Sequence, residues 1–124
     1  MVLSISKEDI QKIKEIVMFC FYENTKPEDQ GNGVVRRVLA HDGVMMAVEN
    51  TFEKGAVGAM HKHPHQQMTY VKSGRFLFTI GDETHEVKAG DTLHKMPNVM
   101  HGCKCLEAGV LIDIFTPQRE DFLK

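Results

Sequence analysis

Residues 55–74 read GAVGAMHKHPHQQMTYVKSG and carry the most specific pattern in this 124-residue chain. Side chains alternate along an extended strand, so His61 and His63 face the same side and can approach one ion. A turn after Pro64 would bring Gln67 back beside them. A fourth ligand, His101 in the segment MPNVMHG, could return to the same place from a separate hairpin. Three imidazoles and a carboxamide make a nitrogen and oxygen site with one or two positions left for water or substrate.

Each of these residues also has an ordinary structural interpretation. His61 and His63 could be exposed histidines of a strand, and Gln67 could hydrogen-bond to a metal-binding residue instead of binding the ion itself. His65 follows the predicted turn and is expected at the rim of the site. We predict one divalent transition metal ion held by His61, His63, Gln67 and His101, and this ligand set accepts Ni, Zn, Mn, Fe or Co.

From Val34 onward, short apolar and β-branched runs are separated by Gly, Asp and Asn, which is typical of antiparallel strands joined by hairpins. The eight runs are VVRRVLA, VMMAVENTF, QMTYVK, RFLFTI, THEVKA, DTLHKM, KCLE and VLIDIF. Tight junctions, with the Gly or Asp that hairpins and bulges favour, are expected at His41-Asp42-Gly43, Ser73-Gly74, Gly81-Asp82, Ala89-Gly90 and Ala108-Gly109. So many hairpins favour a small all-β barrel or jelly roll, which removes sheet edges. Six methionines are expected to fill its interior: Met45, Met46, Met60, Met68, Met96 and Met100.

In the first 33 residues, apolar side chains recur with a different spacing from that of the strands after Val34. Ile10, Ile13, Ile16, Val17 and Cys20 recur at steps of three and four, which predicts an amphipathic helix. The following YENTKPEDQGNG is rich in turn-forming residues and is expected to be a loop. We therefore divide the chain into an N-terminal helix and loop, 1–33, and a barrel with a C-terminal tail, 34–124.

Composition excludes several classes of function. With 42% hydrophobic residues, 26% charged residues and a net charge of -2, the chain forms one domain without the basic surface that nucleic acid requires. It has no apolar run of about 18 residues for a membrane span, and its charged N-terminus does not resemble a signal peptide. Its three cysteines, Cys20, Cys103 and Cys105, are an odd number and badly spaced for a disulfide framework, so they are expected to be reduced. We expect a soluble, cytoplasmic protein that binds neither nucleic acid nor membrane.

These motifs resemble the cupin superfamily from Val34 to about Thr116. The first cupin motif is matched by Gly55, His61-Lys62-His63, Gln67 and Gly74, and the second by Gly90, Met96, Asn98 and His101. Three departures stand out: Gln67 replaces the usual Glu ligand, Met96 and Asn98 replace Pro and Gly, and Cys105 stands where Asn is common. The resemblance implies a β-barrel with the metal inside, and a homodimer, as in many cupins.

An uncharged Gln ligand leaves the ion its full charge, which favours an anionic substrate and Lewis-acid chemistry. In the run GVLIDIFTPQREDF, Leu111, Asp113 and Phe115 share one strand face. An Asp between two apolar residues is costly to bury, so either this face is exposed or Asp113 looks into the metal pocket. Arg119 can fold back and offer a forked donor to a carboxylate, although it could also be half of a surface ion pair.

Within the cupins, the combination of HKHPHQQMTYVKSGRFLFTIGDE, AGD, HG and LEAGVLIDIFTPQREDF is similar to the KdgF family of pectin-degradation proteins. That resemblance implies ring opening of 4,5-unsaturated uronate monosaccharides to linear 5-keto-4-deoxyuronate, in the breakdown of pectin or alginate, with a catalytic set at Asp113, Phe115 and Arg119. In this hypothesis Asp113 is the general acid/base, Phe115 is an apolar wall and Arg119 offsets substrate charge. Phe115 could equally be ordinary core. The alternatives are another small-molecule cupin enzyme, such as a sugar isomerase or dioxygenase, and a sugar-acid binding or sensor module.

Overall fold

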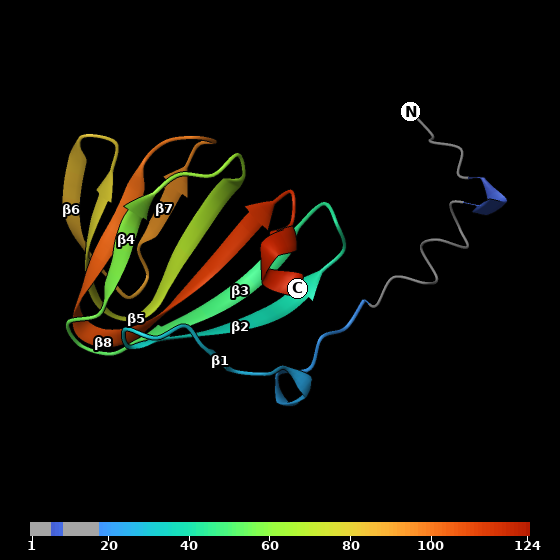
Figure 1. Ribbon diagram of the computed structural model, residues 1–124, viewed down its shortest axis with the longest axis horizontal. Coiled ribbons are helices and arrows are strands. Elements are labelled where there is room, and N and C mark those ends of the chain that lie inside the picture. The colour runs from blue at the N-terminus through green and yellow to red at the C-terminus, as the bar shows by residue number, and fades with distance from the viewer. Residues whose placement is uncertain (1–5, 9–17) are drawn as a thin grey trace.

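The computed structural model describes residues 6–8 and 18–124, and the elements of this part are short 3-10 helices and strands (Figure 1). In chain order they are η1 (Tyr22–Asn24), β1 (Glu28–Asp29), β2 (Val34–His41), β3 (Met46–Phe52), β4 (Val57–His61), β5 (Gln66–Ile80), β6 (Glu83–Lys88), β7 (Thr92–Lys95), β8 (His101–Thr116) and η2 (Glu120–Leu123). The all-β prediction is confirmed. Within the described part, no helix is long and apolar enough to cross a bilayer.

The predicted N-terminal helix is not supported, because among the described residues of that segment only Lys7 and Glu8 are helical and the first element is η1. Most of its apolar stripe, residues 9–17, lies outside those residues, and Cys20 is exposed. The predicted loop that follows contains η1 and β1, and β1 pairs with β2 through Glu28 and Arg36. The division between residues 33 and 34 stays a prediction.

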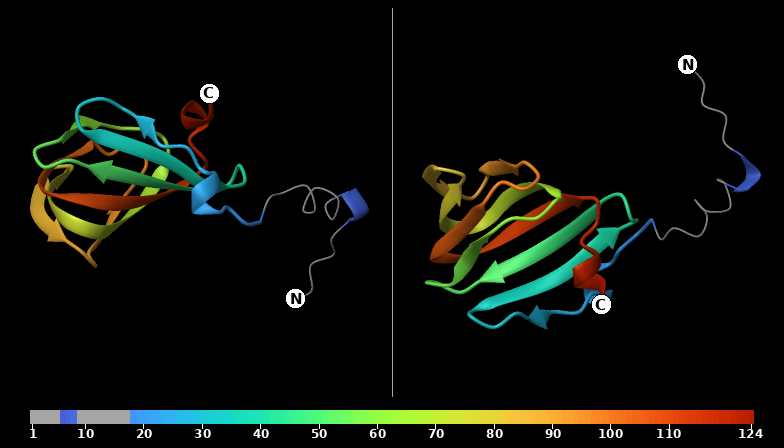
Figure 2. Two further views of the ribbon diagram at one scale, coloured as in Figure 1. Left: turned by 90° about the horizontal axis from the view of Figure 1, so that it is seen from below. Right: turned by 45° about the horizontal axis from the view of Figure 1, so that its top comes forward.

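The strands form one antiparallel sheet in the order β1-β2-β3-β8-β5-β6, with β4 paired to β8 and β7 paired to β5. Figure 2 shows that this sheet curls on itself. It does not close into the predicted barrel, because β1 and β6 end the described order without pairing to each other. The outermost strand β1 is only two residues long, and a very short edge strand is one way in which sheets limit pairing with another chain.

Of the two interpretations open at Ser73-Gly74 and Ala108-Gly109, hairpin and bulge, the hairpin is wrong, because both dipeptides lie inside the long strands β5 and β8. At this point the backbones of the two strands nearly touch. A Cβ on Gly74 would lie 2.6 Å from the Glu107 carbonyl oxygen, and a Cβ on Gly109 would collide with the Ser73 carbonyl oxygen. The register also shifts between residues 71 and 76. These glycines therefore permit a bulged crossing of two continuous strands instead of two turns.

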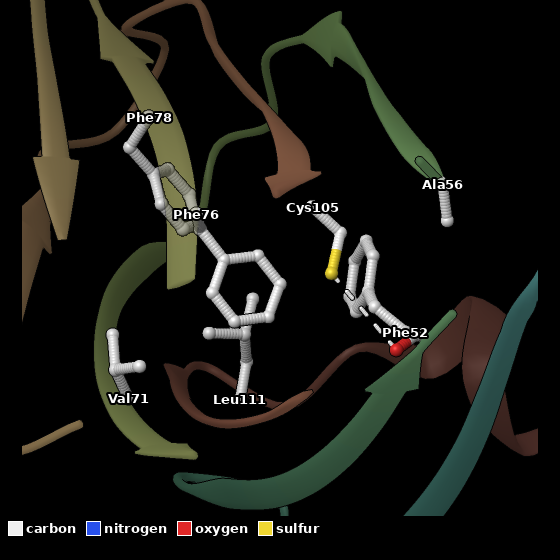
Figure 3. Packing of buried hydrophobic residues seen from close by; sticks show 7 residues of the cluster. All are labelled: Phe52, Ala56, Val71, Phe76, Phe78, Cys105 and Leu111. Atoms are coloured by element: carbon white, nitrogen blue, oxygen red, sulfur yellow. Dashed lines mark hydrogen bonds between the residues drawn. The ribbon is translucent and has the colours of Figure 1, made fainter. Parts of the chain in front are cut away.

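The apolar core lies between the strands that meet at this crossing. Figure 3 shows its larger cluster, which contains Phe52, Ala56, Val71, Phe76, Phe78, Cys105 and Leu111. A smaller cluster, beside the C-terminal residues, is formed by Met46, Val48 and Phe115. The methionine prediction holds only for Met46, which is fully buried. The other five are exposed: Met45, Met60, Met68, Met96 and Met100.

Candidate metal centre and pocket

The three predicted histidine ligands come together from three segments. His61 ends β4, His63 follows it, and His101 begins β8 as the register partner of His61. One ligand nitrogen from each lies within 4.8 Å of the others, which is compatible with a single ion between them. His63 and His101 are buried while His61 is exposed, so the group is open to solvent on one side.

Backbone carbonyls hold the three rings in one tautomer. The Nδ1 atom of each ring lies against a carbonyl oxygen two residues away in the chain, at 2.7 Å in His61 and at 3.1 Å in both His63 and His101. Since a carbonyl can only accept, Nδ1 carries the proton and Nε2 has the free lone pair. This is the arrangement in which metal-binding histidines are usually oriented.

His101 shows most directly that the residues fit a cation. Its Nε2 is buried and has no hydrogen-bond partner within the described part of the chain. Burial, helped by the positive charge of Lys95, lowers the pKa of His101 to about 4, and burial also lowers the pKa of His63. Both imidazoles are therefore neutral at pH 7. A buried, unpaired lone pair is unfavourable, and a metal ion would satisfy it.

Gln67 adds a second acceptor that faces the same point. Its Oε1 lies 2.9 Å from His63 Nε2, while its Nε2 donates to Asp113 Oδ1 at 2.8 Å. Turning the amide over would set its oxygen against the Asp113 carboxylate, so the network fixes the oxygen toward His63. With the proton of His63 on Nδ1, two lone pairs then face each other. A cation bound by both atoms relieves this repulsion, so the donor set fits a metal ion.

The loop before β8 locks this arrangement through Asn98. Its backbone φ is 63°, in the left-handed region that Asn tolerates better than most side chains. This conformation explains how Asn can stand where the cupin motif usually has Gly. The Asn98 N–H donates to the His63 carbonyl at 2.8 Å, and it thereby ties the loop that ends at His101 to the first histidine segment.

Asp113 is buried beside the ligand group, which excludes the interpretation that it faces solvent. Only 4% of it is exposed, and Leu111 and Phe115 are buried on the same face, as the strand pattern predicted. Its carboxylate accepts hydrogen bonds from Gln67 at 2.8 Å, Thr69 at 2.5 Å and Asn50 at 2.7 Å. Asp113 is therefore a fixed negative group that also determines how Gln67 is oriented.

A cavity of about 350 Å³ brings most of the predicted residues together. Its lining includes His61, Gln67, His101, Asp113, Phe115 and Arg119. Phe115 is both core and wall, because it packs with Met46 and Val48 and also lines the cavity. The volume lies at the small end of ligand pockets, so it suits a molecule the size of a monosaccharide.

Arg119 lies at this cavity but already has a carboxylate partner. Its Nε and Nη2 donate to the two oxygens of Asp121 at 3.0 and 2.9 Å. Its guanidinium also lies 4.2 Å from the centre of the Phe122 ring and 5.2 Å from that of Phe115. The forked donor predicted for a substrate is thus engaged within the C-terminal segment itself.

Sequence reasoning missed Lys95, Thr69 and Asn50. Lys95 is 2% exposed, lines the cavity and donates to Thr69 Oγ1 at 2.8 Å. A lysine is by default exposed, but alternation within β7 places Lys95 on the same face as Leu93, and this signal could have found it. Cys103 also lines the cavity, and burial raises the pKa of its thiol to about 11, so it stays a neutral thiol.

The model of the cupin domain matches residues 48–115. The pectin degradation protein KdgF of Dickeya dadantii is 42% identical over 103 residues, which cover 82% of this chain and 94% of that protein.

Two solved structures agree with this relationship. An RmlC-like cupin from Shewanella frigidimarina superposes with a TM-score of 0.83 and 42% identity, over 86% of this chain and 96% of its own. KdgF from Halomonas sp. superposes with a TM-score of 0.81 and 33% identity, over 86% and 98%. The cupin domain model matches this chain from β3 to β8, and the match covers the KdgF proteins almost from end to end. The chain therefore belongs to the cupin family and is a homologue of KdgF.

Proposed function

We propose that this protein opens the ring of 4,5-unsaturated uronate monosaccharides, giving linear 5-keto-4-deoxyuronate, in the degradation of pectin or alginate. The observation that carries the proposal is the buried carboxylate of Asp113, which lines a monosaccharide-sized cavity and is hydrogen-bonded to Gln67, one of the candidate metal ligands. Homology to a protein named for pectin degradation supports the choice of substrate.

The reaction is an isomerisation that needs one proton moved within the substrate. The hydroxyl proton on C1 leaves, the bond between C1 and the ring oxygen breaks, C1 becomes an aldehyde, and C4 receives a proton as C5 becomes a ketone. Asp113 suits this transfer, because its carboxylate lines the cavity and is held in place by three donors. It would accept the proton from the hydroxyl and deliver a proton to C4.

Two neighbours of Asp113 would position the sugar. Phe115, two residues further along β8, offers an apolar surface against a sugar face and is fixed by the core behind it. Arg119 adds positive charge at the cavity while its fork remains on Asp121. His61, His63, His101 and Gln67 would hold one divalent transition metal ion, which when bound supplies Lewis-acid polarisation of a substrate oxygen.

The first experiment follows the ultraviolet absorbance of the conjugated C4=C5 double bond in unsaturated galacturonate made by a pectate lyase. Decay is measured with native protein, with chelated protein and without protein. The proposal requires that native protein speeds decay well beyond the spontaneous rate and that chelation removes the effect. Three coincident traces from protein shown to contain metal would refute ring opening, and oxygen consumption and sugar-acid binding would then be measured.

A small anionic sugar as ligand, a homodimer and a cytoplasmic location complete the proposal. The first follows from the uncharged ligand set around a divalent ion, which favours an anion. The homodimer stays a prediction by analogy with other cupins, and size-exclusion chromatography with light scattering would test it. The location likewise stays a prediction.

A further inference from the structure

Lys95 is the one lysine that the described structure buries within the cavity. It ends β7, opposite Gln67 of β5, and only 2% of it is exposed. Burying an ammonium group is expensive unless a negative group or several acceptors compensate it. The burial of Lys95 therefore needs a compensating partner, which an exposed lysine in a strand would not need.

The contacts of Lys95 compensate its charge incompletely. Its Nζ donates to Thr69 Oγ1 at 2.8 Å and lies 4.6 Å from the centre of the Phe78 ring. An ammonium has three hydrogens to donate, and the hydrogen bonds of the described residues use one. Burial lowers the pKa of Lys95, and the nearby charge of Asp113 opposes this shift only in part. A further acceptor at Nζ would stabilise the charged side chain.

Comparison with the other cations of the cavity singles out Lys95. Arg36 and Arg119 also line it, but each has a carboxylate partner. Arg36 lies 3.7 Å from Glu28 and over the Phe122 ring, although its buried Nε has no hydrogen-bond partner among the described residues. Arg119 makes a two-point pair with Asp121. Within the part of the chain that the structure describes, Lys95 forms no ion pair with a carboxylate. An anion that enters the cavity would have to compete with a carboxylate for the charge of either arginine, but not for that of Lys95.

We propose that Lys95 binds the carboxylate of the sugar acid and so makes the cavity selective for uronates over uncharged sugars. The identity of the ligand rests on the function proposed above. A charged hydrogen bond in a buried site changes binding by about 10- to 100-fold, so this is the preference expected for an acid over its neutral ester. Lys95 is thus a specificity residue, while Asp113 moves the proton.

The test uses D-galacturonate and its methyl ester, two saturated probes that differ in charge at one carbon. Isothermal titration calorimetry measures both affinities in metal-loaded and chelated protein. Lys88→Met, at an exposed lysine of β6, is the matched control for Lys95→Met. We expect wild-type protein and Lys88→Met to bind the acid at least about tenfold more tightly than the ester, and Lys95→Met to lose this preference.

Three results would overturn the proposal: a preserved preference in Lys95→Met, a wild-type protein without a preference, or a preference that chelation abolishes. The last would assign the carboxylate to the metal. If Lys95→Met fails to fold, as its melting curve and metal content would reveal, the structure of the wild-type complex with galacturonate decides. A carboxylate oxygen within hydrogen-bonding distance of Nζ supports the proposal, and a carboxylate bound elsewhere refutes it.

This experiment separates the two proposals. If Lys95 governs the preference but unsaturated galacturonate is not consumed, carboxylate recognition stands and ring opening fails. If the substrate is consumed and Lys95→Met leaves both the KM and the preference unchanged, ring opening stands and the role of Lys95 fails.

Discussion

Replacing Asp113 by Asn and by Ala should separate its role in proton transfer from its role in orienting the candidate metal ligand Gln67. Asn keeps the shape of the side chain and one oxygen, which can still accept from Gln67 and Thr69. Its amide nitrogen would face Asn50, whose own amide can turn to offer an oxygen. Ala removes every acceptor. Both variants lose the carboxylate that would move the proton, but only Ala leaves its three donors without a partner.

The expected magnitudes follow from this count of donors. An unsatisfied buried donor costs about 1 kcal/mol where water from the neighbouring cavity can reach it, so Asp113→Ala should lose about 3 kcal/mol. For 124 residues this corresponds to a melting temperature about 12 °C lower. Asp113→Asn should lose less than about 1 kcal/mol. Turnover should fall at least about 100-fold in both variants, as expected for loss of a general acid/base.

Metal affinity provides the second readout, because Asp113 fixes the amide of Gln67. We expect Asp113→Ala to bind metal about 10- to 100-fold more weakly in a chelator competition, and Asp113→Asn to bind it as the wild type does. Turnover is followed by loss of the double-bond absorbance, with a protein-free baseline, and stability by thermal melts. Wild-type turnover in Asp113→Asn would remove Asp113 from the reaction. Equal stability and metal affinity in the two variants would show that the carboxylate does not hold these donors.

Three further predictions follow from the same geometry. Gln67→Leu should weaken metal binding at least about tenfold in a chelator competition while Gln66→Leu, at its neighbour, does not, and equal affinities would exclude Gln67 as a ligand. The folded-state pKa of His101, about 4, lies below its usual value, so folded protein binds fewer protons than unfolded protein between about pH 6.5 and 4. Metal-free protein should therefore melt at a lower temperature as pH falls through this window, and His101→Gln should flatten the dependence. Gly109→Ala places a Cβ against a backbone carbonyl of β5 and should cost at least about 3 kcal/mol in a denaturant titration, against about 1 kcal/mol for Gly31→Ala, which has open space and only a positive φ.

The parts of the fold and site that the sequence predicts depend on local periodicity. Spacing correctly placed His61 beside His63, and alternation put Asp113 on one strand face with Leu111 and Phe115, although only the structure shows that this face is buried. Turn chemistry likewise predicted the hairpin at Gly81, which lies between β5 and β6. These features need no knowledge of distant segments, so residue type and spacing were sufficient.

The errors arise where distant segments decide the outcome. Gly74 and Gly109 resemble turn glycines in sequence, and only the crossing of β5 and β8 shows that they allow two backbones to approach. Alternation within β7 puts Lys95 on the same face as Leu93, but only the pairing of β7 with β5 shows that this face lies at the cavity and is buried. The methionine prediction failed for a local reason instead, since Met68 alternates with buried residues along β5 and therefore faces outward.

The residue types at positions 67 and 113 depend on each other. The amide presents an oxygen to the imidazole of His63 and, through its nitrogen, a donor to the carboxylate of Asp113 at 2.8 Å. A Glu at this position, usual in the cupin motif, would set two carboxylates at hydrogen-bonding distance, and they would have to share one proton. In the proposed reaction, either the metal ligand or the acid/base group would then lose the protonation state that it needs. If Gln67 binds the metal and Asp113 moves the proton, as proposed, an uncharged ligand is therefore the condition under which the carboxylate can remain beside the metal site and handle protons.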